Sequence, residues 1–253
     1  MTDFAELVAP TGWRTVDLIS DLHLRAEEPA TFEVWRGYLE TTSADALFIL
    51  GDLFEVWVGD DAATRPGFEA DCAELLRHTA ERLPVFFMHG NRDFLVGPAL
   101  AAQCGFTLLD DPTVLSLHGE RWLMSHGDLL CLDDDEYLAF RAQVHAPAWQ
   151  RAFLARPLED RRALARSMRT QSEARKQTPG MVWADVDTDA ARAWLQQSRA
   201  QTLVHGHTHR PARHDLGDGC QRIVLSDWDA AAHPARAQVV CLSPAGAQRV
   251  DLR

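Results

Sequence analysis

The sequence predicts an α/β fold, and two features of the chain predict it. Short apolar, β-prone runs alternate with stretches of helical periodicity up to about residue 110. Acidic, amide and imidazole side chains follow directly after five of the apolar runs along the chain. Because α/β proteins carry their chemistry at the carboxyl ends of the strands, both features indicate the same class of fold.

The first part of the chain follows the order strand, helix, strand, helix, strand. Apolar runs at residues 16–20, 46–50 and 85–88 predict the strands. Helical spacing predicts helices over residues 30–40 and 68–83, the second ending before Pro84. This alternation favours parallel strands joined by right-handed crossovers.

Strand-like runs lie closer together from residue 106 to 124, which predicts antiparallel additions or a second sheet. Similar runs at residues 221–225 and 237–242 close the chain.

A segment of helical composition, residues 133–199, interrupts the strand pattern, and we expect it to be an insertion. Prolines and a glycine divide it into shorter helices, at Pro147, Pro157, Pro179 and Gly180. Its apolar positions are Tyr137, Phe140, Val144, Trp149, Phe153 and Leu154. The segment is either a helical layer over the sheet or a cap that builds a substrate pocket.

Composition limits the class of protein. The chain has 253 residues, enough for one large domain that spans residues 1–253, and its 46% hydrophobic content is typical of a globular protein. No window reaches the roughly 20 apolar residues of a membrane span, and the amino terminus lacks a signal-peptide pattern, so we expect a cytoplasmic protein. Five scattered cysteines argue for free thiols rather than a disulfide framework or a zinc knuckle.

The charge distribution has two parts. The net charge of −12 argues against nucleic acid as a partner. Residues 151–176, however, carry eight basic and three acidic side chains, a local net charge of +5. This segment is either a solvated helix face or a surface that binds an anion.

Seven side chains at the ends of the apolar runs form a candidate metal site. They are Asp21, His23, Asp52, Asn91, His126, His207 and His209. Oxygen and imidazole donors without thiolate suit Mn²⁺, Mg²⁺, Fe²⁺ or Zn²⁺. A single such motif also occurs at ordinary strand ends, but the ordered set predicts a metal site. His89, His205 and His214 match none of these positions, and we expect them to be structural.

With these motifs, the chain resembles the calcineurin-like metallophosphoesterase family. The family blocks are Asp-x-His, Gly-Asp, Gly-Asn-His-(Asp/Glu), His and Gly-His-x-His, in the order found here over residues 17–210. The resemblance implies an αββα sandwich of two mixed sheets with a helical insertion. It also implies that Asp21, His23, Asp52 and His209 hold one metal and that Asp52, Asn91, His126 and His207 hold the other. Two such metals activate a water molecule for attack on phosphorus.

The third block departs from the family pattern, because Arg92 stands where the protein phosphatases carry histidine. Arginine does not act as a general acid near neutral pH, but its planar guanidinium suits phosphate oxygens. The resemblance thus implies Arg92, Asp52 and His126 as catalytic residues, acting on a leaving group that needs little protonation, as in a diphosphate.

Longer strings around these blocks, residues 51–61, 90–94 and 125–134, resemble a branch of the family that hydrolyses UDP-2,3-diacylglucosamine in lipid A biosynthesis. That branch uses two Mn²⁺ ions and releases UMP and 2,3-diacylglucosamine 1-phosphate. The resemblance implies substrate contacts from Asn91, Arg92, Asp134, Ser172 and His207. In the insertion the branch has asparagine and lysine where this chain has Lys176 and Pro179, so Arg175 or Lys176 takes over that role.

A lipid substrate implies peripheral contact with the cytoplasmic side of the inner membrane. Two other functions fit the same motifs. One is a family member that acts on a soluble nucleotide or a dinucleoside polyphosphate. The other is a scaffold that has lost catalysis, as in the retromer.

Overall fold

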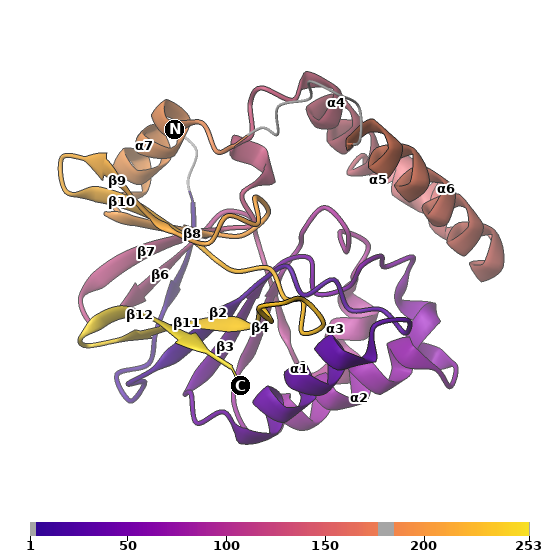
Figure 1. The fold of residues 1–253 in the computed structure, drawn as a ribbon, viewed down its shortest axis with the longest axis horizontal. Helices are drawn as coiled ribbons and strands as arrows, with labels where there is room; N and C mark the ends of the chain where they lie inside the picture. The colour runs from indigo at the N-terminus through magenta and orange to yellow at the C-terminus, as the bar shows by residue number, and fades with distance from the viewer. Residues whose placement is uncertain (1–3, 177–184, 253) are drawn as a thin grey trace.

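Two mixed sheets packed face to face form the centre of the computed structural model, which describes residues 4–176 and 185–252 (Figure 1). The β2–β4 sheet contains, in spatial order, β12 (Gly246–Asp251), β11 (Gln238–Ser243), β2 (Val16–Ile19), β3 (Ala46–Leu50), β4 (Val85–Met88) and β5 (Thr107–Leu109). The β7–β8 sheet contains β1 (Ala5–Val8), β6 (Thr113–Leu117), β7 (Glu120–Ser125), β8 (Thr202–His205), β10 (Cys220–Val224) and β9 (Arg213–Gly217).

The predicted parallel pairing is confirmed. In the β2–β4 sheet, β2, β3, β4 and β5 run parallel, with Val16 opposite Ala46 and Leu47 opposite Val85. Every residue of β3 is buried, as expected for a strand covered on both faces. The second sheet is also as expected, since β6 and β7 form an antiparallel hairpin and β8 lies parallel to β7.

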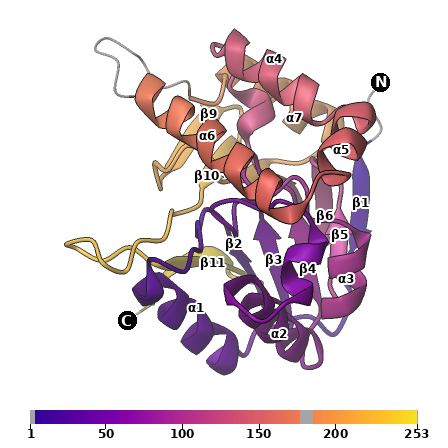
Figure 2. The ribbon, with the colours of Figure 1, turned by 90° about the vertical axis from the view of Figure 1, so that its right-hand side faces the viewer.

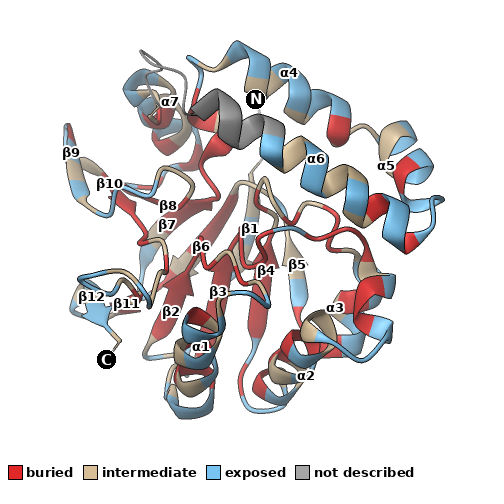
Figure 3. Ribbon diagram, turned by 45° about the vertical axis from the view of Figure 1, so that its right-hand side comes forward, coloured by how far each residue is buried: buried red, intermediate tan, exposed pale blue. Residues whose placement is uncertain are grey.

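Helices cover the outer face of each sheet, so the layers follow the order α, β, β, α. On the β2–β4 sheet lie α1 (Pro29–Thr41), α2 (Phe68–Ala80) and α3 (Pro98–Cys104), and on the β7–β8 sheet lies α7 (Thr188–Ser198). Between the sheets, one buried cluster joins Leu18 and Phe48 to Met124 and Val204. Figure 3 shows the buried residues concentrated in the strands and the exposed ones on the outward helix faces.

Three helices stand outside these layers, and we call them the cap: α4 (Asp135–Val144), α5 (Pro147–Leu154) and α6 (Leu158–Lys176). Helix α6 crosses above the carboxyl ends of β2, β3 and β4 (Figure 2). Phe153 and Leu158 join the buried cluster on the helical side of the β2–β4 sheet, and Trp149 stacks on Phe153.

The predicted insertion contains one helix that is part of the sandwich. Ala191 and Leu195 of α7 pack in a buried cluster with Leu123 and Leu203 of the β7–β8 sheet. The cap thus ends before α7, within the predicted range 133–199. Over the described residues, we find no helix with both the length and the apolar character needed to cross a membrane.

Candidate metal centre

All seven predicted ligands come together at the carboxyl ends of strands from both sheets. The residues follow β2, β3 and β4 in one sheet and β7 and β8 in the other. Contacts of 3.0–3.8 Å connect the seven side chains in an unbroken series. Strands that are remote in sequence therefore build one cluster of donor atoms.

One half of the cluster joins the first and last motifs of the chain. His23 Nε2 lies 3.2 Å from His209 Nε2, and His209 Nε2 lies 3.4 Å from Asp21 Oδ1. His23 Nε2 also lies 3.8 Å from Asp52 Oδ2. Two imidazole nitrogens that face each other beside two carboxylates are arranged as ligands of one cation.

The other half of the cluster gathers around Asn91. Its Oδ1 lies 3.1 Å from His126 Nε2 and 3.0 Å from His207 Nδ1. His126 Nε2 also lies 3.7 Å from Asp52 Oδ2, the oxygen that approaches His23. Asp52 therefore lies between the two halves.

The backbone at the centre is held in a conformation that is uncommon for residues other than glycine. The φ angles of Asp21, His23, Asp52, His207 and His209 lie between +47° and +66°. Such left-handed conformations cost about 1 kcal/mol or more each, and they cluster where function requires a particular side-chain direction. Backbone hydrogen bonds from Asp21 to Gly51 and from His23 to Asp52 stabilise the two adjacent turns.

Contacts outside the cluster fix the orientation of the imidazole rings. His126 Nδ1 lies 2.9 Å from the carbonyl oxygen of Leu50, which leaves Nε2 free as a ligand. His23 Nδ1 lies 3.2 Å from Glu55 Oε2, and His209 Nδ1 lies 4.0 Å from Asp227 Oδ2. In both rings Nδ1 faces an outer carboxylate and Nε2 faces the centre.

Asp93 holds the loops around Asp52. Its carboxylate accepts hydrogen bonds from the backbone N–H groups of Leu53 and Gly90, and the Arg92 N–H donates to Asp52 Oδ1 at 2.8 Å. Burial, together with the charge of Asp52, raises the pKa of Asp93 to about 7.

The electrostatics of the centre favour a bound cation. Burial opposes the charged form of His126, but the carboxylates of Asp52 and Asp21 outweigh burial and raise its pKa to about 9. Burial lowers the pKa of His207 to about 4, and the charge of His126 acts in the same direction. The carboxylates thus favour positive charge at this position, which is the condition that a divalent cation requires.

The residues present fit a paired metal site. Donor atoms of Asp21, His23 and His209 lie within 4.8 Å of one another, and so do those of Asp21, Asp52 and His126. All are hard oxygen or imidazole donors, and the five cysteines are free thiols. This set suits Mn²⁺, Mg²⁺, Fe²⁺ or Zn²⁺.

The predicted substrate contacts fall into three groups. Asn91 and His207 belong to the cluster, and the guanidinium of Arg92 borders it, 3.8 Å from Glu55 Oε1. Asp134 is the N-cap of α4, where its side chain accepts a hydrogen bond from the N–H of Tyr137. The side chains of Ser172, Arg175 and Lys176, and the predicted break at Pro179 and Gly180, lie outside the described part of the structure.

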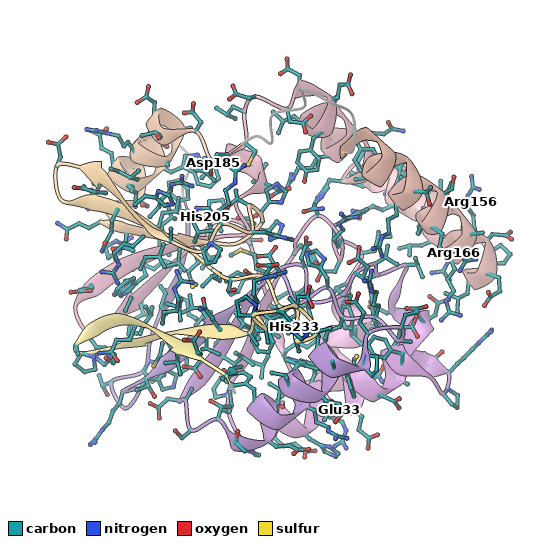
Figure 4. The ribbon with its side chains drawn as sticks, viewed as in Figure 1. Glu33, Arg156, Arg166, Asp185, His205 and His233 are labelled. Carbon is teal, nitrogen blue, oxygen red and sulfur yellow. The ribbon has the colours of Figure 1, made fainter. Side chains whose placement is uncertain are left out.

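The expected structural roles of two histidines agree with their surroundings. His89 Nε2 lies 2.6 Å from the carbonyl oxygen of Val96. His205 is fully buried behind the centre, with Nδ1 2.9 Å from the Gly206 carbonyl and Nε2 3.4 Å from Arg222. Arg222 also donates two hydrogen bonds to Asp185. In Figure 4, Asp185 and His205 lie on the left, away from Arg156 and Arg166 of the cap on the right.

Sequence reasoning assigned no role to Glu55, Asp93 and Asp128, although all three lie within the motif strings at residues 51–61, 90–94 and 125–134. Glu55 contacts His23, Arg92 and Arg169. Asp128 accepts hydrogen bonds from Tyr137 and Arg141 of α4. The signal that could have identified them is their position, two or three residues from a ligand.

Comparisons with known proteins agree with this geometry. Residues 14–211 match the family described as calcineurin-like phosphoesterase. A UDP-2,3-diacylglucosamine hydrolase of Chromobacterium violaceum is 45% identical over 245 residues, which cover 94% of this chain and 98% of that protein. Another, from Xanthomonas axonopodis pv. citri, is 46% identical over 228 residues, with 85% and 91% covered. The structure of an archaeal phosphodiesterase overlays 94% of this chain and 99% of its own at a TM-score of 0.49 and 10% identity, a likeness without bearing on function.

Proposed function

Because this chain belongs to the calcineurin-like phosphoesterase family, and within it to the UDP-2,3-diacylglucosamine hydrolases, we propose that it hydrolyses the diphosphate bond of UDP-2,3-diacylglucosamine. The products are UMP and 2,3-diacylglucosamine 1-phosphate, in lipid A biosynthesis. The observation that carries this proposal is the unbroken series of contacts among the seven donor residues.

The seven donors hold two divalent cations in this proposal. Asp21, His23, Asp52 and His209 bind one, and Asp52, Asn91, His126 and His207 bind the other, with Asp52 shared between them. When bound, the two ions supply Lewis-acid chemistry, which makes hydroxide available near neutral pH and offsets phosphoryl charge. We assign Mn²⁺ as the working metal because the branch of the family that the motif strings resemble uses it, and the oxygen and imidazole donors are compatible with it.

Arg92 stabilises the charge that develops on the phosphate oxygens. Its backbone N–H is tied to Asp52, so the side chain starts from a fixed point beside the centre. A guanidinium matches two phosphate oxygens at once and stays charged at every relevant pH. The leaving group is itself a phosphate ester, so the reaction needs no strong acid at the Arg92 position.

The remaining substrate contacts extend from the centre into the cap. In this proposal Asn91 and His207 contact the phosphates and Asp134 contacts the glucosamine. As the resemblance implies, Ser172 and either Arg175 or Lys176 supply the contacts from the insertion. In the cap, Val144 and Phe153 are buried against the protein, whereas Phe140 and Leu154 of the cap and Leu132 of the loop before it are 40–44% exposed. The exposed three are the side chains available to acyl chains and to peripheral contact with the inner membrane.

The decisive experiment compares two substrates on Mn²⁺-loaded protein. We expect much faster release of UMP from UDP-2,3-diacylglucosamine than turnover of diadenosine tetraphosphate. Hydrolysis in ¹⁸O-labelled water should place the label in UMP, because water attacks the phosphorus on the uridine side.

The Asp52→Ala and His126→Ala variants, which each lose a metal ligand, should be inactive, and Arg92→Ala should lower kcat by roughly 10²-fold.

Other outcomes identify other functions. Preference for the dinucleotide would replace the lipid substrate with a soluble one. Metal-free protein that stays inert with added Mn²⁺ would indicate a scaffold. An effect of Arg92→Ala on KM alone would make Arg92 a binding residue.

A further inference from the structure

Glu55 connects three parts of the molecule that are distant in sequence. Its side chain is 11% exposed. Oε2 lies 3.2 Å from His23 Nδ1, and Oε1 lies 3.0 Å from Arg169 and 3.8 Å from Arg92. One carboxylate therefore meets the loop after β2, the loop after β4 and helix α6 of the cap.

The contact with His23 bears on metal binding. His23 Nδ1 is buried without a well-aligned hydrogen bond among the described residues, and the carboxylate oxygen Glu55 Oε2 lies 3.2 Å from it, while Nε2 faces His209 and Asp52. A carboxylate on the outer nitrogen of a histidine ligand fixes the ring orientation and increases its basicity. Without that partner, the ring is free to turn Nε2 away from the centre.

The contact with Arg169 bears on the cap. Arg161 and Arg162 fasten the first turn of α6, through Asp61 and Glu69. Arg169 lies about two turns further along the helix, roughly 10–12 Å from these anchors. It ties the part of α6 that passes above the strand ends to the metal centre (Figure 2).

We propose that Glu55 is a positioning residue that couples the metal centre to the cap. It keeps His23 in the orientation needed to bind metal, and through Arg169 it keeps α6 over the site. This inference rests on the proposed dinuclear metal function. Its consequence is that loss of the Glu55 carboxylate weakens metal binding and loosens α6 together, whereas loss of Arg169 loosens α6 alone.

The test uses Glu55→Gln, which keeps the size of the side chain and removes its charge, with Arg169→Met as the matched control. Free Mn²⁺ is measured by electron paramagnetic resonance during a titration, and amide hydrogen exchange is followed over residues 158–170. We expect Glu55→Gln to bind one of the two ions about 10–100-fold more weakly and to exchange faster in α6. Arg169→Met should exchange faster in α6 and bind both ions as the wild type does.

The outcomes separate this inference from the proposed function. Wild-type protein that binds no Mn²⁺ would overturn both. Wild-type protein that binds two ions, with Glu55→Gln matching its affinity, would overturn the role of Glu55 alone, as would weakened metal binding in Arg169→Met. If Glu55→Gln does not fold, Glu55→Asp, which keeps the charge but shortens the reach, should show the same two losses in smaller measure.

Discussion

Gly90 and Gly206 stand so close to ligand residues that even a methyl group does not fit. A Cβ atom on Gly90 would lie 2.1 Å from Asp52 Oδ1 and 2.4 Å from its backbone nitrogen. A Cβ atom on Gly206 would lie 2.2 Å from Asp21 Oδ2. The glycines of the Gly-Asn and Gly-His motifs thus let one loop approach the carboxylate of another.

Replacing Gly90 with alanine should displace Asp52, because the added methyl meets both its backbone and its side chain. We expect a stability loss of about 1–3 kcal/mol from overpacking. Activity should fall roughly 10²-fold, since a shift of about 1 Å at a catalytic group has that effect. Denaturant unfolding and initial rates measure the two changes.

Gly37 is the matched control for that substitution. It lies within α1, and a methyl group added there would meet no atom within 4 Å among the described residues outside its own helix turn. Gly37→Ala should therefore stabilise the protein by about 0.5–1 kcal/mol and leave the rate unchanged. Wild-type activity in Gly90→Ala would contradict the prediction, because it would mean that the loops can shift without displacing the Asp52 carboxylate.

The convergence of the seven candidate ligands could be predicted from the sequence because their residue types and order are uncommon together. The role of Glu55 could not be predicted in the same way, because its position three residues after Asp52 is a weak signal that does not show which side chains the carboxylate contacts. Its importance depends on the turn after β3, which brings it back to His23, 32 residues earlier in the chain. Pairings of this kind are set by the tertiary fold.

At the scale of elements, the arginine-rich segment, residues 151–176, shows that a charge pattern does not reveal what the charged side chains contact. The sequence allowed either a solvated helix face or an anion-binding surface. The structure shows a third role, which is to form ion pairs with residues outside the cap. These pairs are Arg161–Asp61, Arg162–Glu69 and Arg169–Glu55. Three of the basic residues therefore fasten α6 to the sandwich.

Arg161 is the most buried of these anchors, 2% exposed, and donates to the Val58 carbonyl as well as to Asp61. In Arg161→Met the Val58 carbonyl loses this donor, and we expect a stability loss of about 1–3 kcal/mol. Arg166 is exposed on the same helix, so Arg166→Met should change stability by less than about 0.5 kcal/mol. Equal effects of the two substitutions in denaturant unfolding would contradict the anchoring role.

The strands that could be predicted are those with long apolar runs, such as β3 and β4. Strands β1, β9 and β12 were missed, and all three lie at the edge of a sheet. These strands have no long buried run, since β1 and β12 have no buried residue and β9 has one, Leu216. Helix α2 ends at Ala80 rather than at residue 83, because residues 81–83 form the turn that leads into Pro84.

At the scale of the whole molecule, the candidate metal centre lies where the two sheets meet. Asp21, Asp52 and Asn91 follow strands of the β2–β4 sheet, and His126 and His207 follow strands of the β7–β8 sheet. Parallel pairing alone predicts that the first three lie together. That the second sheet brings its strand ends to the same edge depends on how the sandwich packs, which periodicity does not specify.

Bound metal should therefore stabilise the whole domain. A ligand that binds only the folded state adds about 2.7 kcal/mol at 100 times its Kd, and in a chain of this size 1 kcal/mol shifts Tm by roughly 2–4 °C. Adding Mn²⁺ to chelator-treated protein should thus raise Tm by roughly 5–10 °C in a thermal scan, and amide exchange should slow at the strand ends of both sheets. The Asp52→Ala variant, which loses the carboxylate between the two halves, should respond much less. A wild-type Tm indifferent to Mn²⁺, or an equal gain in Asp52→Ala, would mean that the seven donors do not bind metal as a unit across the sandwich.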